Sequence, residues 1–75
     1  MKQILLDIAK SIVDKPDEVI VVEKVSGDTS ILELSVAKED MGKVIGRGGK
    51  IAKSIRTIMK AAAVKENKRV IVDII

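Results

Sequence analysis

Apolar residues recur near the start of the chain with the period of a helix. Four of them follow the spacing i, i+3, i+4 and i+7: Leu5, Ile8, Ala9 and Ile12. Asp7 and Lys10 lie between them, which is typical of an amphipathic helix. We expect this helix to cover residues 2–14 and to end before Pro16, because a proline disfavours helical geometry in the residue ahead of it.

Two runs rich in β-branched residues follow, separated by the glycine-containing segment SGDTS. They predict a β-hairpin with strands at residues 18–25 and 31–37. Alternation in the second run places three apolar residues on one face: Leu32, Leu34 and Val36. The first run is apolar at nearly every position, and we expect Ile20 and Val22 to share its buried face. The residues left for the opposite face are Val19, Val21, Glu23 and Val25.

The rest of the chain predicts a short helix, a loop, a long helix and a strand. Their expected bounds are residues 39–45, 46–49, 50–65 and 69–75. The order α-β-β-α-α-β indicates an α+β fold with a three-stranded sheet and all helices on one face. A right-handed crossover would place the last strand beside the second strand and parallel to it, which makes the sheet mixed.

Composition removes several classes of chemistry. The 75 residues are enough for one domain and include no cysteine, histidine or aromatic residue. Zinc fingers, disulfides, and nucleophiles or bases built on cysteine or histidine are therefore excluded. We expect neither an enzyme nor a bound metal or cofactor. We also expect a cytoplasmic protein, because no apolar run reaches the roughly 20 residues of a membrane helix and the N-terminus does not read as a signal peptide.

Charge is distributed unevenly along the chain. Residues 1–37 hold four lysines and seven acidic residues, a net charge of −3. Residues 38–69 hold ten lysines and arginines and three acidic residues, a net charge of +7. This asymmetry suggests that the second segment meets a polyanion. A solvated basic helix face would give the same pattern, and charge alone does not separate the two interpretations.

The glycine-rich segment GRGG, Gly46–Gly49, does not match the common nucleotide-binding motifs. A P-loop starting at Gly42 would need glycine where Arg47 stands, and the dinucleotide fingerprint would need glycine in place of Ile51. The segment fits G-x-x-G between two helices. Such a loop lets a phosphodiester backbone approach closely because no Cβ intervenes, and the following helix N-terminus supplies N–H donors. The alternative is a helix–helix turn that uses glycine as a C-cap.

Cations surround this loop. Arg47 can grip phosphate oxygens, and a track of positive charge follows along the long helix at Lys50, Lys53, Arg56 and Lys60. These residues are the ones expected to face a phosphate backbone.

The segment VIGRGGKIAKSIRTI resembles the signature of the KH RNA-binding domain, V-I-G-x-x-G followed by an I-x-x-I helix. The extra N-terminal helix and strand are similar to the type II form. The whole chain, including DKPDEV and IRTIMKAAA, resembles the small bacterial single-KH proteins of the KhpA type. The resemblance implies that Gly46, Arg47, Gly48 and Gly49 clamp the sugar-phosphate backbone of single-stranded RNA. It implies further that four apolar residues lie near the groove, contacting bases or filling the core: Val44, Ile45, Ala52 and Ile55. Ala52 stands where the general pattern often has isoleucine, which implies a shallower groove.

The resemblance also implies a role as an RNA chaperone or post-transcriptional regulator. Members of this family are similar in forming homodimers and in pairing with a larger KH-containing protein (Jag/EloR/KhpB type) linked to cell elongation and division. Without aromatic residues, bases must be read by hydrogen bonds and aliphatic contact, so we expect modest specificity. Two alternatives stay open: a protein–protein adaptor of KH fold that binds no nucleic acid, and a protein that binds single-stranded DNA.

The long helix carries more apolar surface than one core stripe needs. The residues expected to face the sheet are Ala52, Ile55, Met59, Ala62 and Ala63. Ile51 and Ile58 then project from one flank, with the small residues Ala61 and Ala62 one turn further on. We expect a symmetric dimer around this helix with Ile58 near its two-fold axis. The alternative is that Ile58 completes the monomer core.

Overall fold

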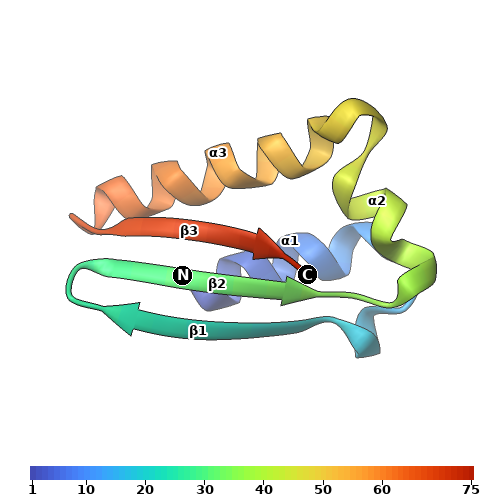
Figure 1. Cartoon of the computed structure of the whole chain (residues 1–75), viewed down its shortest axis with the longest axis horizontal. Coiled ribbons are helices and arrows are strands. Elements are labelled where there is room, and N and C mark those ends of the chain that lie inside the picture. The colour runs from blue at the N-terminus through green and yellow to red at the C-terminus, as the bar shows by residue number, and fades with distance from the viewer.

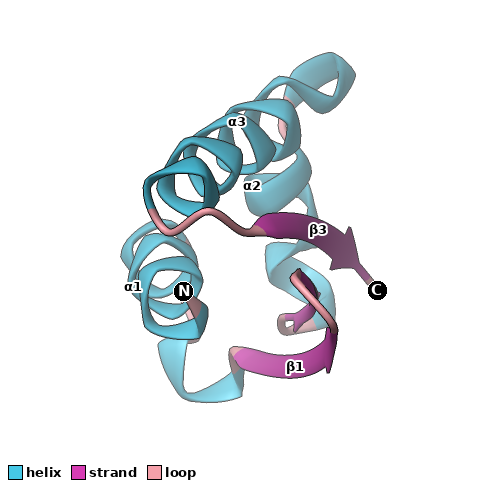
Figure 2. Ribbon diagram, turned by 90° about the vertical axis from the view of Figure 1, so that its left-hand side faces the viewer, coloured by secondary structure: helices cyan, strands magenta, loops and turns pink.

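The computed structural model describes residues 1–75 and consists of a three-stranded sheet with three helices (Figure 1). The helices are α1 (Lys2–Ile12), α2 (Met41–Ile45) and α3 (Lys50–Lys65), and the strands are β1 (Ile20–Ser26), β2 (Thr29–Ser35) and β3 (Arg69–Ile74). All three helices lie on one side of the sheet, and the other side is open (Figure 2). The predicted α+β class and element order are confirmed. No helix has the length and apolar character needed to cross a bilayer.

The strand order in the sheet is β1-β2-β3. β1 and β2 are antiparallel, whereas β2 and β3 are parallel. The chain reaches β3 through α2 and α3, which provide the helical crossover that a parallel pair requires. The predicted mixed sheet, with the last strand beside the second, is therefore confirmed. β3 is an edge strand, and its outer edge has no strand partner.

The buried face predicted for β1 is wrong. Val21 pairs directly with Leu34, and directly opposed residues point to the same face of a sheet. Leu34 is fully buried, so Val21 and, two positions earlier, Val19 are buried with it. Ile20 is 56% exposed and Val22 46% exposed, on the open face of the sheet. The register with β2 decides the face, because both faces of β1 are apolar.

Helix α1 ends at Ile12, two residues earlier than predicted. Val13 is already extended, with φ −98° and ψ 158°. The backbone N–H groups of Asp14 and Lys15 donate to the buried carboxylate of Asp40 instead of continuing the helix. A single 3-10 turn at Pro16–Glu18 then delays the start of β1 to residue 20.

The hairpin turn is tighter than predicted. Ser26 pairs with Thr29, which leaves only Gly27 and Asp28 in the turn. Gly27 has a φ of +63°, a conformation that favours glycine. Because the turn is short, β2 covers residues 29–35 and not 31–37.

The remaining bounds lie close to expectation. A 3-10 turn at Lys38–Asp40 precedes α2, so the α-helix itself starts at Met41 and not at residue 39. Helix α3 covers residues 50–65 as expected, and β3 ends one residue early, at Ile74.

The core is aliphatic and lies between the sheet and the helices. Its buried members come from α1, all three strands and α3, and include Leu5, Leu32, Leu34, Met59 and Val72. Of the five residues expected to face the sheet from α3, four are buried: Ala52, Ile55, Met59 and Ala63. Ala62 is only half-buried. Ile58 is 49% exposed, so it does not complete the core, and that alternative is wrong.

Candidate nucleic-acid interface

The loop Gly46–Gly49 joins α2 to α3, and its glycines have two structural roles. Gly46 has φ +76° and ψ 174°, and a Cβ placed on it would lie 2.6 Å from Cγ1 of Ile51. It must therefore be glycine for the loop to pack against the first turn of α3. Gly48 and Gly49 have φ values of +63° and +76° with open space around them. They turn the loop outward and leave its surface free of side chains.

The loop leads directly into the N-terminus of α3, where Gly49 is the N-cap. No side chain caps the first turn of this helix. The N–H groups of Gly49 and Lys50 already donate to the carbonyl oxygens of Gly46 and Arg47, in a 3-10 turn over Arg47–Gly49. This end of α3 therefore offers an anion mainly the positive end of its helix dipole. A phosphate can approach this end of α3 across the bare glycines, because nothing lies within 4 Å of the Cβ positions of Gly48 and Gly49.

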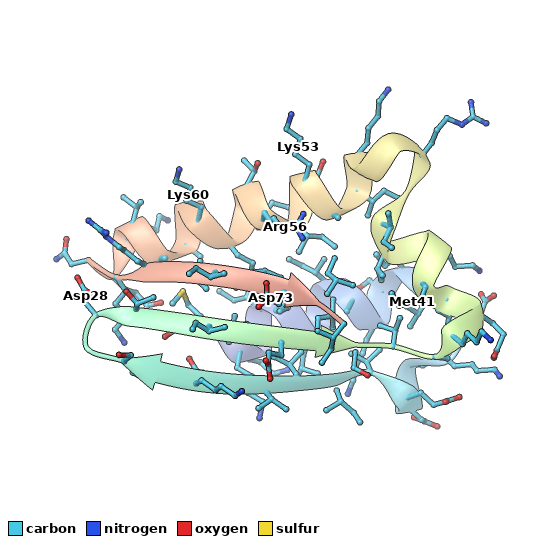
Figure 3. All side chains as sticks on the ribbon, in the orientation of Figure 1. Asp28, Met41, Lys53, Arg56, Lys60 and Asp73 are labelled. Atoms are coloured by element: carbon cyan, nitrogen blue, oxygen red, sulfur yellow. The ribbon has the colours of Figure 1, made fainter.

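The cations around the loop are not neutralised by acidic neighbours. All four ion pairs in the structure involve lysines that precede the loop: Lys15, Lys24 and Lys43. Arg47, Lys50 and Lys53 are exposed and make no ion pair. Lys53 and Lys60 extend from α3 into open space in Figure 3. The positive charge of the loop and helix is therefore available to a polyanion.

Arg56 occupies a different place from the lysines. Its Nε donates a hydrogen bond of 3.3 Å to the backbone carbonyl oxygen of Val72 in β3. This bond holds the guanidinium at the outer edge of the sheet. Arg56 also lines a cavity of about 330 Å³ between α3 and β3, together with Lys60 and residues 70–73.

The outer edge of β3 presents backbone hydrogen-bonding groups to that cavity. The N–H groups of Arg69 and Ile75 donate inward, to carbonyl oxygens of Asp28 and Leu34. Backbone groups alternate in direction along a strand, so those of Val70, Val72 and Ile74 point outward. The carbonyl oxygen of Val72 already accepts from Arg56. The other outward groups have no strand partner and are available to a ligand.

The apolar residues predicted to lie near the groove separate into two groups. Val44, Ala52 and Ile55 are buried in the monomer. They are not available for contact with a ligand in this conformation. Ile45 is 38% exposed beside the loop and is the member of the set that can touch a base.

The two flanks of α3 differ in character. The exposed side chains of Ile51 and Ile58 lie on one flank, with half-buried Ala62 at its inner border and Ala61 on the solvent side. At 100° per residue, Ile58 and Lys60 point about 160° apart around the helix axis. Arg56 and Lys60 face the edge of β3, and Ile51 and Ile58 face away from it. Lys50 and Lys53 lie on the solvent side of the helix, where they line a hollow with Ile58.

Asp40 is a residue of the site region whose role sequence reasoning missed. It is 1% exposed, and its two carboxylate oxygens accept hydrogen bonds from the N–H groups of Asp14 and Lys15 at 3.1 and 3.0 Å. These bonds tie the start of α2 to the end of α1. The loop at the other end of α2 is thereby fixed relative to the core.

Exposed ion pairs surround this anchor. A hydrogen bond with Glu39 raises the pKa of Lys15 above its ordinary value, and the same bond lowers the pKa of Glu39. Asp14 raises the pKa of Lys43 by a 2.5 Å hydrogen bond. No three acidic side chains come together to hold a metal ion.

This chain is similar in sequence to small bacterial proteins. The family described as "KhpA/KhpB, KH domain" matches residues 2–74. A protein of Clostridium acetobutylicum named "RNA-binding protein KhpA" is 68% identical over 75 residues, and one of the same name from Clostridium perfringens is 60% identical. A third, from Caldanaerobacter subterraneus subsp. tengcongensis, is 57% identical. Each alignment covers the whole of both chains. No solved structure gives a significant match. The chain therefore belongs to the KhpA/KhpB family of KH domains.

Proposed function

We propose that this protein binds single-stranded RNA and that the loop Gly46–Gly49 clamps its sugar-phosphate backbone. The observation that carries the proposal is the N-terminus of α3, which no side chain caps. It is reached across side-chain-free glycines and surrounded by cations that make no ion pair. The relatives described above are named RNA-binding proteins, which supports the same ligand. Arg47, Lys50 and Lys53 would contact phosphates on the two sides of the clamp.

The bases of the bound strand would lie between the loop and the edge of β3. KH domains hold about four nucleotides through their G-x-x-G loop. Aromatic stacking is not available in this chain. Bases would instead meet Ile45, the guanidinium of Arg56 and the outward backbone groups of β3. Backbone groups discriminate bases less sharply than a dedicated set of side chains, so modest sequence specificity fits a role as an RNA chaperone or post-transcriptional regulator.

The apolar flank of α3 supports a second part of the proposal, a homodimer. Ile51 and Ile58 are exposed on it, and Ala61 and Ala62 would let a second backbone come close. A KH domain of a larger protein with a similar helix could use the same flank in a heterodimer, as the family resemblance implies. In the adaptor alternative, this flank is the only functional surface and the protein binds no RNA. A measurement of RNA binding therefore separates that alternative from the proposal.

The clamp is tested by replacing Arg47 and Gly48 together with aspartate. Two carboxylates would then face the phosphates, and binding of a random-sequence RNA pool of about five nucleotides should be lost. The fold should survive, because a Cβ at Gly48 meets no atom within 4 Å and aspartate is among the residues that best tolerate a φ of +63°. Wild-type affinity should fall with salt, with a log–log slope of roughly −0.7 per phosphate contacted.

The chain offers a matched control for this experiment. Gly27 has the same φ of +63° as Gly48 and equally open surroundings. Lys10 is an exposed cation with no ion pair. Lys10→Asp combined with Gly27→Asp therefore makes the same change in charge and the same demand on the backbone, but away from the loop. If the loop variant binds as well as this control, the clamp is wrong. Competition between RNA and DNA pools of equal length identifies the preferred sugar.

A further inference from the structure

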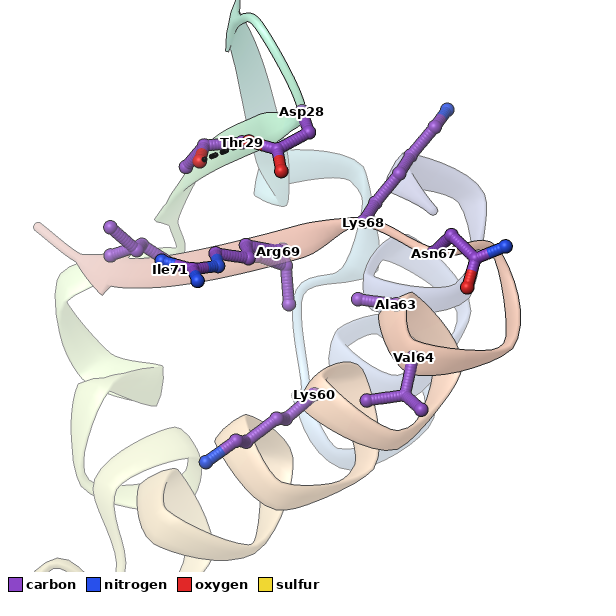
Figure 4. Close-up of a pocket in the computed structure, with 10 residues that line it drawn as sticks. Asp28, Thr29, Lys60, Ala63, Val64, Asn67, Lys68, Arg69 and Ile71 are labelled. Carbon is purple, nitrogen blue, oxygen red and sulfur yellow. Dashed lines mark hydrogen bonds between the residues drawn. The ribbon is translucent and has the colours of Figure 1, made fainter.

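A second, larger cavity lies at the end of the molecule opposite the loop (Figure 4). It has a volume of about 800 Å³ and is enclosed by the last turns of α3, the start of β3 and the hairpin turn between β1 and β2. We call it the distal cavity. Ala63, Val70 and Ile71 give it an apolar wall. Among its lining residues, only Lys60 belongs to the cationic track that the sequence predicted; the sequence motifs and the family comparison assign no role to the others.

The distal cavity is continuous with the groove beside Arg56. Lys60, Val70 and Ile71 line both the distal cavity and the smaller cavity of about 330 Å³. A single furrow therefore follows the junction of α3 and β3 away from the loop. A strand held at the loop and directed along β3 would reach the distal cavity without crossing the sheet.

The polar residues of the distal cavity have the chemistry of a nucleotide site. Lys60 from α3, with Lys68 and Arg69 at the start of β3, are exposed cations with no ion pair. Asp28 and Thr29 supply hydrogen-bond acceptors from the hairpin turn. Cations at the rim suit phosphates, and acceptors beside an apolar wall suit the amino or imino groups of a base.

The length of α3 separates the distal cavity from the nucleotides held at the clamp. Helix α3 has 16 residues, so its two ends are about 24 Å apart. About four nucleotides that keep the stacked spacing of roughly 3.4 Å span about 14 Å, and such a segment held at the loop ends before the distal cavity. The distal cavity would therefore take later nucleotides of the same strand.

We propose that the distal cavity is a second nucleotide subsite, which binds unpaired RNA beyond the segment held at the loop. The proposal rests on the proposed function, since the same strand must first engage the clamp. It predicts a footprint longer than that of the clamp alone. RNA length is therefore the variable that reports on the distal cavity.

The test compares random-sequence RNA pools of about five and about twelve nucleotides by fluorescence anisotropy, with wild-type protein and a Lys68→Ala/Arg69→Ala variant. We expect the variant to bind the long pool roughly tenfold more weakly and the short pool within about twofold of wild type. In the variant, the log–log slope of affinity against salt concentration for the long pool should become less steep by about 1.4, because two phosphate contacts are lost. Both residues are exposed, so the fold should be retained. Val64→Glu, an exposed position in the same cavity, should lower long-pool affinity in the same way.

The control is Lys2→Ala/Lys10→Ala, which removes two exposed, unpaired cations from α1. Equal losses for the two pools, or a loss no larger than in this control, would overturn the distal subsite and leave general charge attraction. Failure of the clamp has a different signature. In that case the Arg47→Asp/Gly48→Asp variant would keep its affinity for the short pool, whatever the distal variants do.

Discussion

Gly46→Ala is the substitution that tests most directly how the loop is built. At φ +76° and ψ 174°, Gly46 occupies a region that only glycine adopts readily, and forcing alanine there costs about 1–3 kcal/mol. Its new methyl group would also lie 2.6 Å from Cγ1 and 2.9 Å from Cβ of Ile51. The side chain of Ile51 is β-branched and stiff, so this overlap costs about another 1–3 kcal/mol.

The expected loss of unfolding free energy is therefore about 2–6 kcal/mol, out of roughly 4–11 kcal/mol for a domain of this size. Urea denaturation followed by far-ultraviolet circular dichroism measures it. Gly42→Ala is the matched control, because Gly42 lies within α2 and has nothing within 4 Å of its Cβ position. That substitution should stabilise the protein by about 0.5–1 kcal/mol.

A double-mutant cycle separates the two contributions to the cost. Ile51→Ala removes Cγ1 and Cδ1 but keeps the Cβ at 2.9 Å. Gly46→Ala should therefore cost about 1 kcal/mol less in that background, with the backbone strain remaining. The reasoning is refuted if Gly46→Ala costs no more than Gly42→Ala, or if the cycle shows no coupling.

Three further outcomes are expected. If the protein forms the proposed dimer, Ile58→Lys should convert it to a folded monomer in sedimentation velocity, and an undisturbed dimer would remove Ile58 from the interface. Asp40→Asn should lower the free energy of unfolding by about 1.5–3 kcal/mol, because charge-assisted hydrogen bonds to two N–H groups are weakened. Hydrogen exchange of the backbone amides of Asp14 and Lys15 should become faster, and unchanged exchange would contradict the anchor. The pKa of Glu39 is lowered in the folded state, so its stabilising contribution is present above its ordinary value of 4.5 and is lost as pH falls through the folded value. Glu39→Gln should flatten that acid limb in urea titrations, and an unchanged limb would argue against the Lys15 pair.

The sequence predicted best those elements whose apolar pattern is compatible with only one buried face. In α3, the apolar residues that recur at helical spacing predicted the bounds and four of the five residues expected in the buried stripe, with Ala62 only half-buried. In β1, consecutive apolar residues at 19–22 fit either face equally well, and only pairing with β2 resolves them. A two-residue turn at Gly27 and Asp28 determines that pairing, which local composition did not predict.

The candidate site was predictable to the extent that it is local. The loop, its flanking helices and the cations of α3 are contiguous in the sequence, so their spacing was sufficient. The anchor at Asp40 joins residues 25 and 26 positions apart. The acceptor role of a single aspartate has no periodic signal, and its burial depends on how α1 and α2 pack. The distal cavity likewise combines the hairpin turn with the end of α3, which only the folded chain brings together.

The opposed flanks of α3 have a consequence for valency. If two copies meet through the flank of Ile51 and Ile58, each cationic furrow faces outward, and the two-fold axis turns them to opposite sides of the pair. Two separate RNA segments would then be held at a fixed spacing by one small particle. Each captured segment raises the effective concentration of the other, by an amount set by the distance between the furrows and not by the affinity of either. Such an assembly would bring strands together without recognising their sequence.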